Sequence, residues 1–103
     1  MRKVIFISLG ERDRLLVDGP SFLAVHAGIE PRDVIHLDDL AERALEPDDG
    51  TLAACFSGDA EYVVGCSRPR AARALLRFAG IGLNGKTIGW VALPFDREAL
   101  KRG

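Results

Sequence analysis

The chain has 103 residues, a length typical of one domain, and we predict a single domain over residues 1–103. Hydrophobic residues make up 48% and charged residues 28%, a composition that excludes an intrinsically disordered chain. The net charge of −1 argues against general nucleic-acid or membrane-surface binding, and no apolar run reaches the roughly 20 residues that span a bilayer.

The first quarter of the chain contains a strand and a short helix. The β-branched run KVIFISLG, residues 3–10, predicts a strand buried on both faces, as in a parallel sheet. A short helix is predicted over Pro20–Ala27, because Asp18 or Ser21 can cap its start and Gly28 can end it.

The middle of the chain repeats this order with weaker signals. RDVIHL, Arg32–Leu37, predicts a second strand. A helix opened by Asp38 or Asp39 is expected to end before Pro47. TLAACF, Thr51–Phe56, is predicted as a strand, with a helical turn as the alternative because alanine prefers helix.

The second half of the chain carries clearer patterns. Glu61–Cys66 predicts an inner strand, Pro69–Ala79 predicts a helix that Gly80 ends, and Lys86–Leu93 predicts the last strand. The C-terminal PFDREALKRG is expected to form a short helix or a frayed tail. The alternation predicts a three-layer, Rossmann-like α/β domain with a mostly parallel sheet of four or five strands.

The strand Glu61–Cys66 ends in a cysteine at the start of the next helix. A helix N-terminus lowers the pKa of a cysteine, which makes Cys66 a candidate catalytic thiolate. The flanking residues complete no such motif, because Pro69 stands where a thioredoxin-type motif has its second cysteine and Ala72 where a phosphatase-type loop has its arginine. The alternative is that Cys66 packs as a small core residue and Ser67 caps the helix.

The same turn is a candidate anion site. In open α/β sheets, ligands bind beyond the carboxyl ends of the strands, and the N–H groups at a helix start attract phosphate. The segment SLGER after the first strand reaches the same edge, but its single glycine makes no dinucleotide fingerprint. The predicted ligand-binding residues are Ser8, Gly10, Gly65, Ser67, Arg68 and Arg70.

The helix that follows has two distinct faces. At helical spacing the predicted core face consists of Ala71, Ala74, Leu75 and Phe78. A stripe without interleaved acids lies on another face and either binds an acidic partner or is simply solvated. The predicted partner-binding residues are Arg70, Arg73 and Arg77.

The segment EYVVGCSRPRAARALLRFAGI, followed by KTIGWVAL, resembles a strand–Cys–helix–Ala-Gly-Leu/Ile–strand pattern of two small α/β domains. One belongs to the N-terminal region of heterodisulfide reductase, and the other is the delta subunit of methyl-viologen-reducing hydrogenase. The resemblance implies an electron-transfer setting, a partner complex and an iron–sulfur cluster. Only Cys66 falls on a family cysteine, and ISLG stands where those families carry cysteines, so the resemblance implies a partner-binding relative that lacks the cluster ligands.

Two functional interpretations remain. The first is a non-enzymatic accessory or binding domain, with an expected redox association, that acts through a protein partner or homo-oligomer and binds a phosphate-containing small molecule or nucleotide at the strand ends. It is favoured because no nucleophile with a base and an orienting group can be assembled. The alternative is a thiol- or phosphate-handling enzyme centred on Cys66.

Cofactors and localisation are constrained only weakly. Neither His26 nor His36 has a partner at a metal-ligand spacing, so no metal site is predicted, and the sequence does not identify a cofactor. The N-terminal apolar run is too short for a secretory signal, so we expect a cytoplasmic protein without a membrane span whose two cysteines, Cys55 and Cys66, are reduced.

Overall fold

Strands and helices alternate along the chain in the computed structural model, which describes residues 2–10, 15–45, 51–58 and 60–94. The strands are β1 (Arg2–Ile7), β2 (Ile35–Leu37), β3 (Glu61–Cys66) and β4 (Thr87–Ala92). The helices are α1 (Gly19–Ala27), α2 (Leu40–Leu45), α3 (Thr51–Cys55) and α4 (Pro69–Phe78), and a short 3₁₀ helix, Pro31–Asp33, precedes β2.

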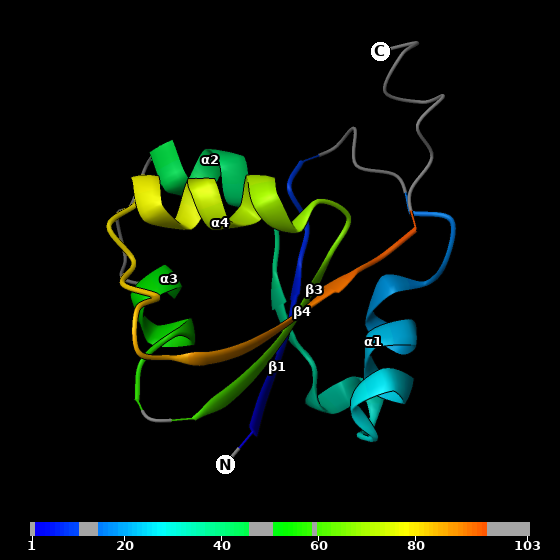
Figure 1. Ribbon diagram of the computed structural model, residues 1–103. Coiled ribbons are helices and arrows are strands. Elements are labelled where there is room, and N and C mark those ends of the chain that lie inside the picture. The colour runs from blue at the N-terminus through cyan, green and yellow to red at the C-terminus, as the bar shows by residue number, and fades with distance from the viewer. Residues whose placement is uncertain (1, 11–14, 46–50, 59, 95–103) are drawn as a thin grey trace, which may run out of the picture.

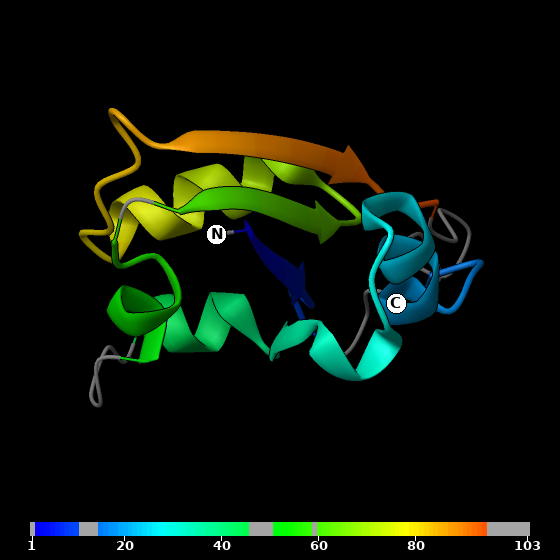
Figure 2. The same ribbon diagram turned by 90° about the horizontal axis from the view of Figure 1, so that it is seen from below.

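The four strands are parallel and lie in the order β2-β1-β3-β4. The chain passes from β1 through α1 to β2, crosses back through α2 and α3 to β3, and continues through α4 to β4 (Figure 1). α1 covers one face of the sheet, and α2, α3 and α4 lie on the other (Figure 2). The predicted Rossmann-like α/β fold is confirmed, and the sheet is wholly parallel.

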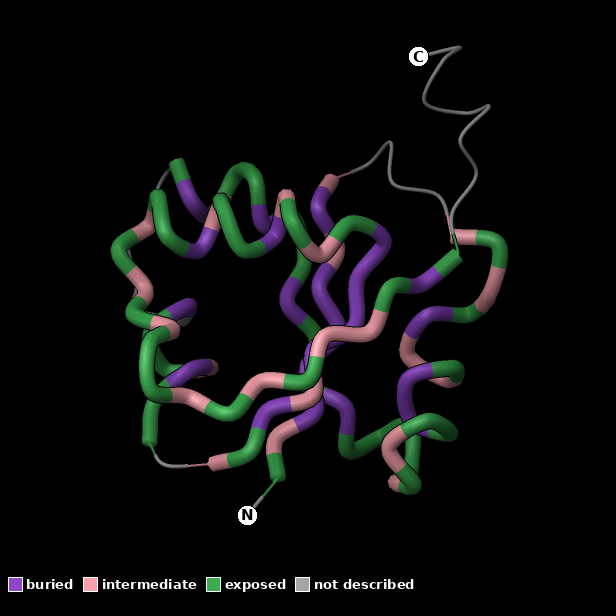
Figure 3. Tube along the Cα trace, viewed as in Figure 1, coloured by how far each residue is buried: buried purple, intermediate pink, exposed green. Residues whose placement is uncertain are grey.

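The two central strands are buried on both faces, because alternate side chains enter two different hydrophobic clusters. Ile5 and Val64 belong to the cluster under α2, α3 and α4, whereas Val4 and Phe6 belong to the cluster under α1. Figure 3 shows the resulting concentration of buried segments in the central strands. An apolar run without alternation, as in β1, is what such a strand requires.

Helix α1 packs closely against β3 at Gly65. A Cβ atom added there would lie 2.8 Å from Cδ1 and 2.9 Å from Cδ2 of the buried Leu23, so the missing side chain lets the helix approach the strand. The start of α1 agrees with the prediction, since the Asp18 carboxylate accepts a hydrogen bond from the Ser21 N–H at 3.3 Å. Gly28 ends the helix with a φ of 72°.

The predicted strand over Thr51–Phe56 is wrong, and the helical alternative holds because this segment forms α3. Leu52 and Phe56 are four residues apart and both buried, as helical spacing requires. The ring centroid of Phe56 lies 5.6 Å from that of Tyr62 on β3. The alanines between these anchors favour helix, and the sheet therefore has four strands.

The second strand is shorter than the predicted Arg32–Leu37. It begins at Ile35, because Pro31 starts a 3₁₀ turn in which the Val34 N–H donates to the Pro31 carbonyl at 3.2 Å. Within the described ranges no helix is long and apolar enough to cross a membrane. The predicted helix end before Pro47 and the predicted helix or tail over residues 95–103 lie outside the described residues.

The predicted core face of α4 is wrong for half of its members. The helix buries Ala72 and Leu76, leaves Ala71 and Leu75 half-buried, and exposes Ala74 and Phe78. Because the inward stripe is rotated by about one residue from the predicted one, the outward stripe combines the arginines with an exposed phenylalanine. Gly80 follows the helix with a φ of 84°, as its predicted role requires.

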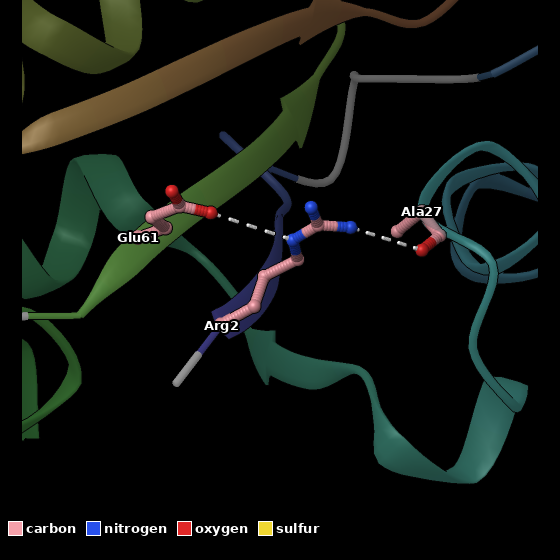
Figure 4. A network of polar contacts seen from close by, with 3 residues as sticks. All are labelled: Arg2, Ala27 and Glu61. Carbon is pink, nitrogen blue, oxygen red and sulfur yellow. Dashed lines mark hydrogen bonds and ion pairs between the residues drawn. The ribbon is translucent and has the colours of Figure 1, made fainter.

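Arg2 links β1 to two neighbouring elements at the amino-terminal ends of the strands (Figure 4). Its Nη1 donates to the Ala27 carbonyl of α1 at 3.4 Å, and its Nε lies 3.9 Å from Oε2 of Glu61 on β3. Both charged side chains are exposed, so the ion pair contributes at most about 1 kcal/mol.

The substitution Gly65→Ala tests the contact between α1 and β3. We expect it to lower the free energy of unfolding by about 1–3 kcal/mol, because Leu23 is fully buried and has no space to move away. Urea denaturation followed by circular dichroism measures the change. Gly82→Ala is the control, since an added Cβ meets nothing within 4 Å, and equal losses in the two variants would contradict the account.

Candidate functional site

The candidate site lies at the carboxyl ends of β1 and β3, where the chain order in the sheet reverses. The Ser8 N–H donates to the Leu37 carbonyl at 3.0 Å, and the Leu40 N–H donates to the Ser8 carbonyl at 2.9 Å. These bonds fasten the end of β1 to the segment that enters α2. Open α/β sheets bind ligands at such a reversal, because the connections leave on opposite faces of the sheet there.

Helix α4 begins at this edge without a side-chain cap. Its N-cap residue is Arg68, with φ −137° and ψ 89°, and that side chain makes no capping hydrogen bond. The interpretation of Ser67 as the N-cap is therefore wrong. The first N–H to bond back along the helix is that of Ala72, to the Arg68 carbonyl at 3.1 Å, so the N–H groups of Arg70 and Ala71 have no partner within the helix.

Ser67 is the most unusual polar residue of this edge. Its side chain is 5% exposed, and its Oγ is buried without a hydrogen-bond partner in the described structure. A buried hydroxyl without a partner costs about 1–3 kcal/mol. Such a group next to an uncapped helix start indicates that a partner from outside the described chain completes the site.

The two predicted glycines of the site play different roles. Gly10, after β1, is half-buried, and an added Cβ would meet nothing within 4 Å, so space is open at that position. Gly65 is buried against Leu23 and serves the packing of α1. The structure therefore brings Ser8, Gly10 and the start of α4 to one edge of the sheet and places Gly65 beneath it.

The two cysteines are free thiols in different surroundings. Cys66 is fully buried in the cluster under α2, α3 and α4, and its carbonyl accepts a hydrogen bond from the Leu93 N–H at 2.8 Å. Cys55 is half-buried in α3. Burial raises the pKa of the Cys55 thiol, and the nearby charges of Lys3 and Arg43 partly oppose that rise. The catalytic role of Cys66 stays a prediction, and its burial weighs against it.

The predicted arginine stripe lines a shallow groove of about 250 Å³ on the outer face of α4. The groove is formed by Arg70, Arg73, Ala74 and Arg77. None of its three arginines forms an ion pair with an acidic residue in the described part of the chain. Phe78 is 70% exposed at the end of the same stripe. Sequence reasoning missed Ala74 and Phe78, because apolar side chains at helical spacing predict a core face.

The described ranges contain no group of three or more His, Cys, Asp or Glu side chains that could hold a metal ion. No protein-family model, curated protein or solved structure matches this chain. The resemblance to the two redox families, and the partner complex that it implies, therefore stay predictions.

Thiol reactivity separates the two cysteines. We expect Cys55 to react with iodoacetamide more slowly than a free thiol at neutral pH, and to accelerate as the pH rises past the ordinary thiol pKa of about 8.5, because its raised pKa keeps it protonated. In a Cys55→Ala background, Cys66 should react only after unfolding in urea. Rapid reaction of folded Cys66 below that pH would contradict this and would restore the thiol-enzyme interpretation.

Proposed function

We propose that the chain is a binding domain that holds an anionic group, such as the phosphate of a small molecule, at the start of α4. The observation that carries the proposal is the buried Ser67 Oγ without a partner beside an uncapped helix start. Hydroxyl and backbone N–H groups both donate hydrogen bonds to phosphate, and a helix N-terminus favours negative charge.

The charges at this helix start support the same proposal. Helices usually carry acidic residues in the first turn, yet the first turn of α4 has none and contains Arg70, next to Arg68 at the N-cap. Positive charge at the positive end of a helix dipole is unfavourable by some tenths of a kcal/mol. A bound anion would reverse the sign of this interaction, so the arrangement favours the ligand-bound state over the free one.

The alternative, a thiol- or phosphate-handling enzyme, has less support. A nucleophilic thiol must reach its substrate, and Cys66 has no exposed surface. A binding role needs only the donors at the helix start, which do not require Cys66 to move.

The groove on α4 supports a second binding role, toward an acidic protein partner. Three arginines without ion pairs in the described residues and an exposed phenylalanine form a continuous face, which consists of Arg70, Arg73, Arg77 and Phe78. Arginine and aromatic side chains dominate the energetics of protein interfaces. The net charge of −1 makes a nucleic acid a poorer candidate.

The substitution Ser67→Ala tests the anion site through two effects of opposite sign. Removing a hydroxyl that lacks a partner should raise the stability of the ligand-free protein by about 1 kcal/mol. The same change should weaken phosphate binding about tenfold, because a hydrogen bond to a charged group is lost. Thermal unfolding in inorganic phosphate, against chloride at equal ionic strength, measures both effects.

Ser57→Ala is the matched control for this test. The Ser57 hydroxyl is exposed and donates to the Ala54 carbonyl at 3.0 Å, before β3 begins and away from the start of α4 (Figure 1). This control should leave phosphate-induced stabilisation unchanged. If Ser67→Ala destabilises the free protein and leaves the phosphate effect intact, the hydroxyl serves the fold and the anion site is wrong.

The variants Arg73→Ala and Arg77→Ala test the groove. Binding of a labelled helical peptide rich in glutamate and leucine, measured by fluorescence anisotropy, should weaken about two- to fivefold for each substitution, as expected for exposed ion pairs. Arg32→Ala, an exposed arginine outside the groove, should have no effect. Equal losses at Arg32 would indicate non-specific attraction, and tighter binding of an oligothymidine with the same arginine dependence would indicate a nucleic-acid partner.

A further inference from the structure

Strand β4 forms one outer edge of the sheet in the described part of the chain (Figure 2). Its six residues, TIGWVA, include no charged residue and no proline, and each pairs with a residue of β3 in continuous register. An uncharged, regular edge strand is a ready template for another strand.

The opposite edge of the same sheet is protected. Strand β2 has only three residues. Exposed charges flank it on both sides, with Arg32 and Asp33 before it and Asp38 and Asp39 after it. Short edge strands with flanking charges resist pairing with other chains. The contrast within one sheet indicates that β4 meets a partner strand and that β2 does not.

The backbone of β4 directs alternate residues toward β3 and away from it. The Leu93 N–H donates to the Cys66 carbonyl at 2.8 Å. By the alternation of a β-ladder, the N–H and C=O groups of Ile88, Trp90 and Ala92 therefore point away from β3. Beyond the end of the strand, the Pro94 carbonyl accepts a hydrogen bond from the Leu16 N–H at 3.0 Å, so the chain itself covers that position. The outward groups within β4 are the ones that an added strand would use.

We propose that β4 pairs antiparallel with β4 of a second copy of this chain, so that one sheet runs through a two-fold symmetric dimer. A two-fold axis normal to the sheet places residues of equal orientation opposite each other, which centres the pairing on Gly89 or Trp90. In either register Ile88 and Trp90 lie on the face that packs toward α4. Both side chains are only half-buried in the single chain, and the partner strand covers them further.

The charge of the strand favours a second copy over an unrelated partner. Two identical strands that carry a charged residue place like charges near each other, which is unfavourable. β4 has no charge to create this conflict, and two chains of net charge −1 repel each other weakly. The dimer is independent of the proposed anion site, because β4 lies on the far side of β3 from β1.

Self-association of the full-length chain tests the proposal. Sedimentation velocity over a wide range of concentrations should show a monomer–dimer equilibrium. Trp90 is the single tryptophan, so its emission should shift to shorter wavelength as the dimer forms. Amide hydrogen exchange of Ile88, Trp90 and Ala92 should slow with increasing concentration.

Two variants locate the interface without removing core side chains. Ala92→Pro deletes an outward N–H at an exposed position, and proline is tolerated at such edge positions. Gly89→Lys places a charge on the strand, where an added Cβ meets only the Tyr62 carbonyl at 3.8 Å. Each should weaken the dimer by about tenfold or more while leaving circular dichroism unchanged. Ile35→Lys on β2 is the matched control and should leave the dimer intact.

Three results would overturn the proposal. One is a monomer at every concentration. Another is a dimer that persists unchanged in both Ala92→Pro and Gly89→Lys, which would place the interface elsewhere. The last is strong, concentration-independent protection of the Ile88, Trp90 and Ala92 amides, which would mean that the chain covers its own edge. If Ala92→Pro fails to fold, Gly89→Lys and the exchange data still decide.

Discussion

Burial of β1 and β3 on both faces is the constraint on which the rest of the structure depends. A strand that buries alternate side chains in two clusters needs helices on both sides of the sheet, and parallel strands need crossover connections to supply them. To cover both faces, the chain leaves β1 toward β2 and returns past β1 to β3. That reversal opens the carboxyl ends of the two central strands and places the start of α4 beside them.

The features at this edge do little for the fold itself. A cap at the start of α4, an acid in its first turn and a partner for the Ser67 hydroxyl would each stabilise the protein, yet the structure has none of them in its described part. Sites that lower stability without a ligand are typical of binding sites, where the ligand supplies the missing interaction. The well-packed contact of Gly65 with Leu23 lies just beneath this edge and holds it in place.

Sequence patterns predicted the parts of the fold that local chemistry determines. The apolar runs of β1 and β3, the Asp18 cap and the positive-φ glycine after α4 follow from backbone rules that act within a few residues. The failures concern tertiary context. α3 was predicted as a strand because TLAACF suits either structure, and the orientation of α4 depends on neighbours that the sequence does not show. The burial of the Ser67 hydroxyl is also tertiary, so its unusual state was invisible in the sequence.

The central claim is that an anion binds at the start of α4, and backbone NMR tests it most directly. ¹⁵N–¹H spectra of the full chain, recorded during a titration with inorganic phosphate at constant ionic strength, should show saturable shifts of the Arg68, Arg70 and Ala71 amides. Amides at the far end of α4 should move little. Shifts that never saturate, or that spread evenly over the exposed arginines, would show that phosphate only screens the surface and would contradict the account.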